Sequence, residues 1–369
     1  MTASGWRVVA FPARGVDGAV QEQTGLLRLP VTRPPAGGHP VVVYGHMTTG
    51  GSPRSAPSAG DPAHPEWRRM SQGDALCEAL LARGIAVLRP DYEGIGGPGV
   101  HPYLIGASLA ESMTAMVRAR AGFGVPLGDE WVAAGHSEGA VAALHASVAA
   151  EPDERSRLRG TAAFAPVTRM DRSIAAAVRL GVRFPGSGVV SALVALMLRG
   201  AATGDERMRE LLASDGLSPA ARARWAELDE RCLTELAAAD SWGAIAPGRI
   251  AGARGAELFE RLFASFRANE VAELRGFRAP VRIDAARFDE VAPAPLSAAL
   301  LRSYRRAGVE LTSRWWPTHH SGTMHPQHAP SLAADWIAAR FDGATESAAP
   351  SGERRGGLRR VRARRASSW

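Results

Sequence analysis

Cysteine is scarce in this chain of 369 residues, which contains only Cys77 and Cys232. Two cysteines so far apart cannot build a disulfide framework or a thiolate metal cage. Both lie in apolar, helix-like surroundings, so we interpret each as a packing residue. Long apolar runs are also missing, since none reaches the ~20 residues needed to span a bilayer. Residues 1–7 contain no basic segment followed by a hydrophobic one, which predicts a cytoplasmic protein without a signal peptide.

Excess charge of one sign is nearly absent outside the C-terminal end. The formal net charge is +7, and residues 345–369 contribute +5 of it through seven arginines and two glutamates. The remaining +2 is spread over residues 1–344, so we expect no nucleic-acid partner. We interpret residues 345–369 as a disordered, solvated tail, and contact of this tail with a membrane is the less favoured alternative.

The residues that are present have the composition of a globular protein. Hydrophobic residues make up 46% of the chain and charged residues 22%, which excludes a disordered polyampholyte or a collagen-like fibre. Predicted strands cover residues 26–31, 41–44, 85–88, 131–134, 161–164, 281–286 and 310–316. Predicted helices cover residues 72–83, 107–120, 138–150, 296–307 and 331–341. This alternation predicts an α/β fold with a mostly parallel central sheet and helices on both faces.

One block of the sequence breaks the alternation. Between residues 166 and 278 we find no strand pattern, only helical stretches at 173–184, 189–198, 219–238 and 253–273. An all-helical block between two sheet strands predicts a cap inserted over the carboxyl ends of the strands. The expected organisation is therefore a core of residues 1–166 and 277–344, a helical cap or lid of residues 167–276, and the tail.

The pentapeptide Gly135-His136-Ser137-Glu138-Gly139 matches the pattern G-x-S-x-G and directly follows a predicted strand and precedes a predicted helix. This is the context of a nucleophile elbow, a tight strand-to-helix turn that needs small residues on both sides of the serine. The turn lifts the serine hydroxyl above the sheet edge, near a helix N-terminus that favours negative charge. We therefore predict that Ser137 is a nucleophile, the competing interpretation being a helix-capping serine.

A serine hydroxyl needs a base, and in this arrangement an acid and then a histidine follow along the chain, at the ends of later strands. His320 lies in the loop just beyond the strand at 310–316 and precedes the flexible pair Ser321-Gly322. We prefer His320 as the base, with His319 second. His325 and His328 are interpreted as surface or loop residues. A metal site at these late histidines is disfavoured, because no HExxH motif or cysteine pair accompanies them.

The acid is expected just after the strand at 281–286. Asp289 occupies that place, and its carboxylate would orient the imidazole and stabilise the imidazolium. Asp284, inside the strand, and Glu290, one residue further on, are second choices, and Asp289 could instead be a loop or capping residue.

An oxyanion hole needs two backbone N–H groups aimed at the carbonyl oxygen of the substrate. One should belong to Glu138, the residue after the nucleophile, and the other to the loop after the strand at 41–44. We predict Thr48 for the second, with Met47 as the alternative.

Several segments, in the same order, resemble the secretory-lipase (lipase-A-like) family of α/β-hydrolases, from about Thr24 to Gly343. These segments are Gly45-His46-Met47-Thr48-Thr49-Gly50 with Ala56-Pro57-Ser58; Pro90-Asp91-Tyr92-Glu93-Gly94 with His101-Pro102-Tyr103; the elbow at 135–139; Pro280 to Pro293; and Pro317-Thr318-His319-His320-Ser321-Gly322. The resemblance implies an α/β-hydrolase fold with a helical lid, Asp289 as acid, His320 as base, and a structural role for Asp91. The chain has Met47, Glu138 and Ala286 where the family has glycine, glutamine and glycine.

These observations favour a serine hydrolase of carboxylic esters that needs no cofactor and no metal. The apolar cap suggests a small lipophilic ester as substrate. Two alternatives stay open at this level. An acyltransferase would use the same triad with an alcohol or amine in place of water, and a catalytically inactive binding protein would use the basic tail to hold anionic lipid or nucleic acid.

Overall fold

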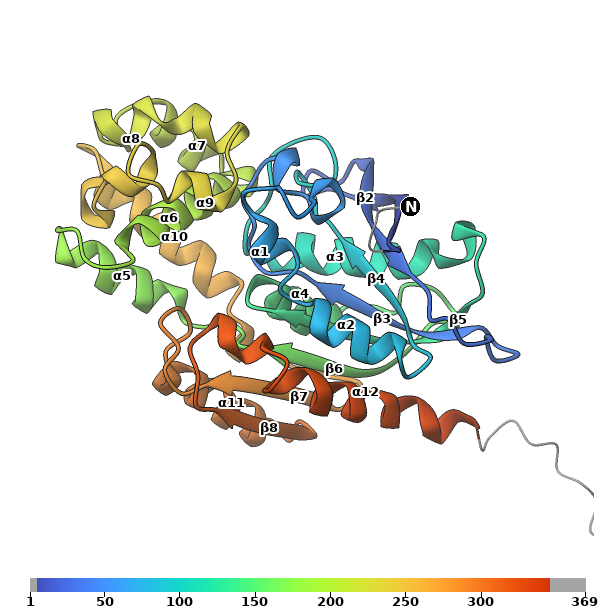
Figure 1. Cartoon of the computed structure of the whole chain (residues 1–369). Coiled ribbons are helices and arrows are strands. Elements are labelled where there is room, and N and C mark those ends of the chain that lie inside the picture. The colour runs from blue at the N-terminus through green and yellow to red at the C-terminus, as the bar shows by residue number, and fades with distance from the viewer. Residues whose placement is uncertain (1–4, 346–369) are drawn as a thin grey trace, which may run out of the picture.

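The computed structural model describes residues 5–345, and its centre is an eight-stranded sheet formed by these residues in the order β1-β2-β4-β3-β5-β6-β7-β8 (Figure 1). Strand β2 runs antiparallel to its neighbours β1 and β4, whereas the other neighbouring pairs are parallel. The strands are β1 (Arg7–Arg14), β2 (Val20–Arg28), β3 (His39–Gly45), β4 (Ala86–Pro90), β5 (Leu127–His136), β6 (Arg157–Phe164), β7 (Val281–Ala286) and β8 (Leu311–Trp316). The predicted mostly parallel sheet is confirmed.

The antiparallel edge of the sheet is where the sequence prediction is weakest. The strand predicted at 26–31 lies earlier, at Val20–Arg28, and the hairpin partner Arg7–Arg14 was not predicted. Buried and exposed positions alternate along β1, so only three of its eight side chains, those of Val9, Phe11 and Ala13, are apolar and buried. Such an edge strand lacks the continuous apolar run that identifies the buried parallel strands.

Helices cover both faces of the sheet because successive side chains of each buried strand point to opposite faces. Val41 and Val43 of β3 pack in one core cluster, and Val42 and Tyr44 pack in the other. Helices α2 (Asp74–Leu81) and α12 (Ala329–Thr345) cover one face. Helices α3 (Gly106–Arg118), α4 (Glu138–Val148) and α11 (Ala294–Arg306) cover the other. Helix α1 (Trp67–Met70) precedes α2.

Residues 166–278, all of which the structure describes, contribute helices and no strand to the sheet, and they lie beyond the strands' carboxyl ends (Figure 1). The α-helices are α5 (Met170–Leu180), α6 (Ser187–Ala201), α7 (Glu206–Ala213), α8 (Pro219–Ala223), α9 (Leu233–Leu236) and α10 (Gly255–Ala268). The single helix predicted over 219–238 is wrong, because the chain is extended at Cys232, which forms an isolated bridge with Gly50 in the loop after β3.

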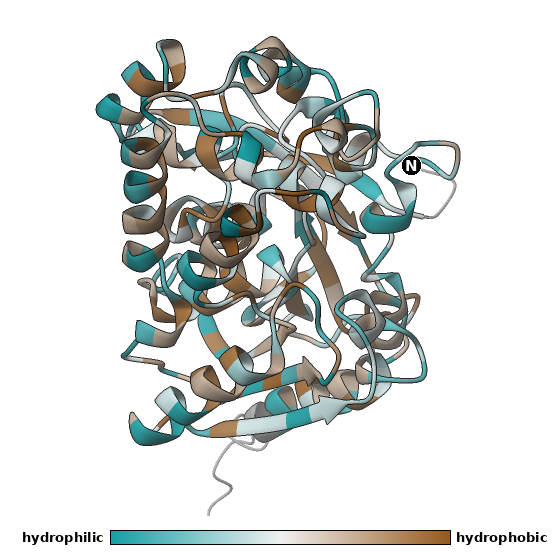
Figure 2. Cartoon of the chain, turned by 90° about the vertical axis from the view of Figure 1, so that its left-hand side faces the viewer, coloured by the Kyte–Doolittle hydropathy of each residue, from teal (hydrophilic) through white to brown (hydrophobic). Residues whose placement is uncertain are grey.

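Among the described residues, one helical stretch, Ser187–Gly204, is long and apolar enough to cross a membrane by length and composition. In the structure 61% of this stretch is buried, and its helix α6 packs against α9 and α10 of the same block. Figure 2 views the molecule from the side of this block and shows polar and apolar stretches alternating along its helices. The arginine-rich tail predicted to be disordered lies, from residue 346 onward, outside the described residues.

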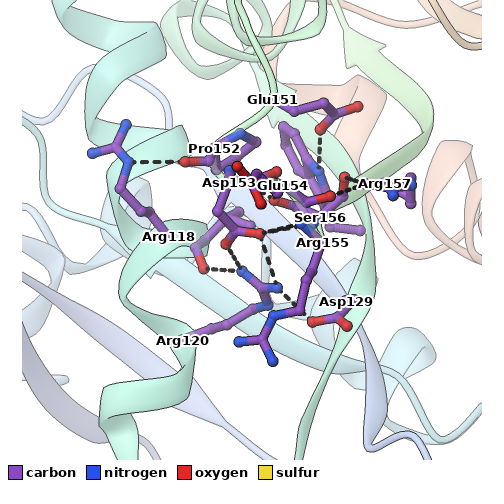
Figure 3. A network of polar contacts seen from close by, with 12 residues as sticks. Arg118, Arg120, Asp129, Glu151, Pro152, Asp153, Glu154, Arg155, Ser156 and Arg157 are labelled. Atoms are coloured by element: carbon purple, nitrogen blue, oxygen red, sulfur yellow. Dashed lines mark hydrogen bonds and ion pairs between the residues drawn. The ribbon is translucent and has the colours of Figure 1, made fainter.

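A buried arginine ties together the end of α3, the start of β5 and the loop before β6 (Figure 3). Arg120, whose side chain is 3% exposed, forms ion pairs with Asp129 and Asp153 and donates hydrogen bonds to the carbonyl oxygens of Val117 and Gly128. Burial alone would raise the pKa of Asp153, but hydrogen bonds from Arg120 and Ser156 outweigh it and hold the pKa well below its usual value. The charged form of this carboxyl is therefore favoured by folding.

Replacing Arg120 with alanine is expected to lower the free energy of unfolding by about 2–3 kcal/mol at pH 7, because the buried cation and its hydrogen bonds are lost. The pKa of Asp153 is lower in the folded protein than in the unfolded chain, where it is about 4. The ionised carboxylate therefore stabilises the fold fully above pH 4, and this contribution disappears as the pH falls toward the pKa of the folded protein. Urea denaturation measures the free energy of unfolding of wild type and variant at pH 7 and at pH 3. The difference in this free energy between the two proteins should be smaller at pH 3. A difference that stays constant would contradict this account.

Candidate active site

The G-x-S-x-G segment forms a sharp turn between β5 and α4. Ser137 has φ 58° and ψ −115°, a conformation that is strained for a residue with a side chain. A Cβ on Gly135 would lie 2.0 Å from the carbonyl oxygen of Gly139, and a Cβ on Gly139 would lie 1.9 Å from that of Gly45. The turn therefore requires glycine at these positions, as the sequence predicts for a nucleophile elbow.

An alanine at Gly139 is expected to lower the free energy of unfolding by roughly 3 kcal/mol, because backbone atoms on both sides of the turn must move apart. Gly37→Ala is the matched control, since a Cβ at Gly37 meets no atom within 4 Å. Thermal unfolding of the two variants measures the difference. A Gly139→Ala protein as stable as the Gly37→Ala protein would show that the turn can adjust.

The structure brings Ser137, His320 and Asp289 into contact, although they are far apart in the sequence. His320 Nε2 lies 2.8 Å from Ser137 Oγ, and His320 Nδ1 lies 2.9 Å from both carboxylate oxygens of Asp289. Ser137 is 6% exposed, His320 3% and Asp289 8%. Low exposure strengthens hydrogen bonds between these groups and keeps the imidazole in one orientation. The arrangement can take a proton from the serine hydroxyl and stabilise the resulting imidazolium.

Backbone and neighbouring side chains fix the two partners of the serine. Asp289 Oδ1 accepts hydrogen bonds from the N–H groups of Val291 and Ala292, and Glu290 Oε2 accepts one from the N–H of His320. His136 Nε2 lies 3.3 Å from the carbonyl oxygen of His320. Burial lowers the pKa of His136 well below its usual value, so its ring is neutral and donates this bond.

Of the second choices for acid and base, Glu290 contacts only the backbone N–H of His320, and the others lie away from the Ser137 hydroxyl. Asp284 is fully buried, and its carboxylate accepts hydrogen bonds from the guanidinium of Arg282 and the indole N–H of Trp316. His319 is exposed. His328 Nδ1 bonds the carbonyl oxygen of Gly322, and its ring lies 5.8 Å from that of the exposed His325. Within residues 5–345, no group of three or more histidine, cysteine or acidic side chains is placed to hold a metal ion.

The two residues predicted as oxyanion donors belong to the turn after β5 and to the loop after β3. Glu138 is the first residue of α4, so its N–H has no partner within the helix. Thr48 is buried in the loop after β3, and its Oγ1 lies 2.8 Å from the hydroxyl oxygen of Tyr103. Burial lowers the pKa of His46 to about 3, and its neutral ring donates from Nδ1 to the carbonyl oxygen of Met47 at 2.7 Å.

The loop after β3 is held from two sides. The N–H of Leu233, in the inserted block, donates to the carbonyl oxygen of Thr49 at 2.8 Å. Asp91 accepts from the N–H of Ser58 and from the Thr24 hydroxyl, which joins this loop to β2 and β4. Burial raises the pKa of Asp91, and these hydrogen bonds oppose the rise. Asp91 therefore has the structural contacts that the resemblance implies.

Two partners of the predicted residues were not identified from the sequence. His101 contacts the side chain of Glu138, and Tyr103 contacts Thr48. Both belong to the segment His101-Pro102-Tyr103, which the sequence singles out only through its resemblance to a family. Spacing carries no signal here, because the pairing depends on how the loop after β4 folds back over the sheet edge.

Comparison with solved structures defines the class of the fold. The chain superposes on Candida antarctica lipase A in its closed state with a TM-score of 0.73, at 15% identity over 91% of this chain and 77% of that one. It superposes on a rice cell wall degrading esterase from Xanthomonas oryzae with a TM-score of 0.66, at 18% identity over 91% and 89% of the two chains. These similarities show an α/β-hydrolase fold. No curated protein matches the sequence.

The family model of the secretory lipases matches residues 69–348, which is more than half of the chain, and the protein belongs to this family. It is therefore a carboxylic ester hydrolase, and the family indicates lipophilic esters as substrates. The predicted cytoplasmic location is wrong, because membership of the secretory lipase family implies an extracellular protein. The composition of a few residues is a weaker guide to location than a match over most of the chain.

Proposed function

We propose that the protein hydrolyses lipophilic carboxylic esters through an acyl-enzyme intermediate on Ser137. The observation that carries the proposal is the continuous set of contacts from the Ser137 hydroxyl through His320 to Asp289, with distances of 2.8 and 2.9 Å. The neutral His136 and the N–H groups around Asp289 support the required orientation.

In this mechanism Ser137 Oγ attacks the acyl carbon while its proton passes to His320 Nε2. Negative charge develops on the carbonyl oxygen, and this oxygen accepts hydrogen bonds from the N–H groups of Thr48 and Glu138. His320 then gives the proton to the departing alcohol. A water molecule loses a proton to His320, attacks the acyl carbon and releases the acid, and Ser137 regains its proton. Asp289 stays ionised and holds Nδ1–H of the imidazole throughout.

The inserted helical block supports a preference for apolar acyl or aryl groups. We propose that residues 167–276 form a lid over a core of residues 1–166 and 277–344. Cys232 and Leu233 of the block contact the loop after β3, at Gly50 and Thr49. Ser137 is buried. In this proposal the block moves aside to admit an ester, and its closure over the bound ester expels water from the reaction site.

A fluorophosphonate probe tests the proposal on the wild-type protein. The hydroxyl of Ser137 is expected to attack phosphorus and displace fluoride, giving one covalent label on the peptide that contains Ser137. Hydrolysis of p-nitrophenyl butyrate should fall in proportion to labelling, and heat-denatured protein is the unlabelled control. Hydrolysis that persists in fully labelled protein, or a label on another residue, would overturn the assignment.

The same experiment separates the proposal from its alternatives. A catalytically inactive binding protein would neither react with the probe nor release p-nitrophenol. An acyltransferase would react with the probe but would form the ester of an added alcohol in preference to the free acid. Product analysis in the presence of a series of alcohols measures this ratio, and a hydrolase is expected to release mainly the acid.

A further inference from the structure

The carboxyl group of Glu138, the residue that follows the candidate nucleophile, is completely buried. An isolated carboxylate in such a place is strongly unfavourable, because it has lost its hydration. It would also repel the negative charge that develops on the substrate's carbonyl oxygen, which the N–H of the same residue is proposed to bind. The charge of this side chain therefore bears directly on the reaction.

His101 is the hydrogen-bond partner of this carboxyl group. Its Nε2 lies 2.7 Å from Glu138 Oε1, and its Nδ1 lies 2.9 Å from the carbonyl oxygen of Glu93. A carbonyl oxygen only accepts hydrogen bonds, so Nδ1 must carry a hydrogen. The short contact between Nε2 and Oε1 needs one more hydrogen between two atoms that would otherwise repel each other. If His101 holds this hydrogen, the pair consists of an imidazolium and a carboxylate. If Glu138 holds it, both groups are neutral, so the net charge of the pair is zero in either case.

Other rings enclose this pair and connect it to the second oxyanion donor. His101 lies between Tyr92 and Tyr103, with each ring centroid 5.9 Å away. The Tyr103 hydroxyl bonds Thr48 Oγ1, and the Tyr92 hydroxyl donates to the carbonyl oxygen of His46. The pair is therefore connected to the loop of Thr48 through the two tyrosines, while Glu138 itself belongs to the other segment that supplies a proposed oxyanion donor.

The titratable groups around the pair remain uncharged near neutral pH. Burial, reinforced by the nearby Glu138, raises the pKa of the Tyr92 and Tyr103 hydroxyls. His46, which stacks on Tyr92 at 4.4 Å, is neutral because burial lowers its pKa. Further out, the charged Arg89 and Asp91 act on Tyr92, and the carboxyl group of Glu93 accepts hydrogen bonds from the Ser108 hydroxyl and the N–H of Val16.

We propose that Glu138 and His101 form a proton-sharing pair that keeps the region behind the oxyanion hole electrically neutral and positions the N–H of Glu138. Both are positioning residues through their side chains, and the inference rests on the proposed function of Ser137. Without His101, the carboxyl group must either ionise beside the oxyanion or take a proton from solvent. The loss of activity should then grow as the pH rises and the carboxyl group ionises.

His101→Phe tests the pair, because phenylalanine keeps the ring between the two tyrosines but cannot share a proton. We expect kcat for p-nitrophenyl butyrate to fall by about 100-fold relative to wild type at pH 8, the size of effect seen when an oxyanion donor is lost. At pH 6 the loss should be at least threefold smaller, and KM should change less than kcat. His101→Gln, which also leaves the carboxyl charge uncompensated, should behave in the same way and serves if the phenylalanine variant does not fold.

The double variant His101→Phe/Glu138→Gln distinguishes charge from packing. Removing the carboxyl charge is expected to raise kcat at pH 8 at least tenfold above that of His101→Phe. It should also remove the pH dependence that His101→Phe adds. Glu138→Gln alone is the fourth protein of this double-mutant cycle. A loss that is equal at both pH values, or no gain in the double variant, would overturn the proposal. Failure of the wild type to react with fluorophosphonate at Ser137 would instead overturn the proposed function.

Discussion

Alanine in place of Ser137 is expected to lower kcat for p-nitrophenyl butyrate by about 10⁶-fold. The reason is that His320 Nε2, which lies 2.8 Å from the hydroxyl oxygen, then has no nucleophile to deprotonate. The fold should be retained, since the hydroxyl is the only group removed and the backbone at this turn is held by β5 and α4. Steady-state hydrolysis and thermal unfolding measure the two properties.

Ser147→Ala is the matched control for this substitution. Ser147 lies in α4 and is buried like Ser137, and its hydroxyl donates to the carbonyl oxygen of Leu144. Its replacement removes the same atom, a hydroxyl oxygen that bonds Leu144 and not His320, and kcat should stay within twofold of the wild-type value. Hydrolysis retained by Ser137→Ala, or lost equally in both variants, would contradict the role assigned to Ser137.

Asparagine in place of Asp289 is expected to lower kcat by about 10⁴-fold. The amide group of asparagine can donate a hydrogen bond to His320 Nδ1, which leaves the ring hydrogen on Nε2. That nitrogen then has no lone pair for the proton of Ser137. The N–H groups of Val291 and Ala292 can still bond the amide oxygen, so the loop should keep its shape.

Glu290→Gln is the control for Asp289→Asn, because it makes the same chemical change in the next residue. Glu290 contacts only the backbone N–H of His320 among the groups of the triad, and glutamine keeps an oxygen for that bond. We expect a loss of less than tenfold. Equal losses in the two variants would mean that the loop, and not the carboxylate facing the imidazole, is what the reaction requires.

The sequence predicted the buried parallel part of the fold well. Strand β7 was predicted with the bounds that the structure has, and β3 and β5 within a few residues, because buried parallel strands are short apolar runs between glycines and polar residues. The hairpin of β1 and β2 and the broken helix at 219–238 were predicted poorly. In both, contacts with distant residues outweigh local preference, as the bridge between Gly50 and Cys232 illustrates.

By itself the sequence determined the α/β order of elements, the glycine-flanked turn at Ser137 and the loops in which an acid and a histidine follow. These features depend on local sequence. Only glycine fits beside the turn at Ser137, and the acid and the histidine lie in the loops that directly follow two predicted strands. The tertiary structure alone decided that His320, and not the exposed His319, meets Ser137. It also decided that Glu138 is buried against His101. Such contacts depend on how loops from different strands converge at one sheet edge, and no spacing along the chain records that convergence.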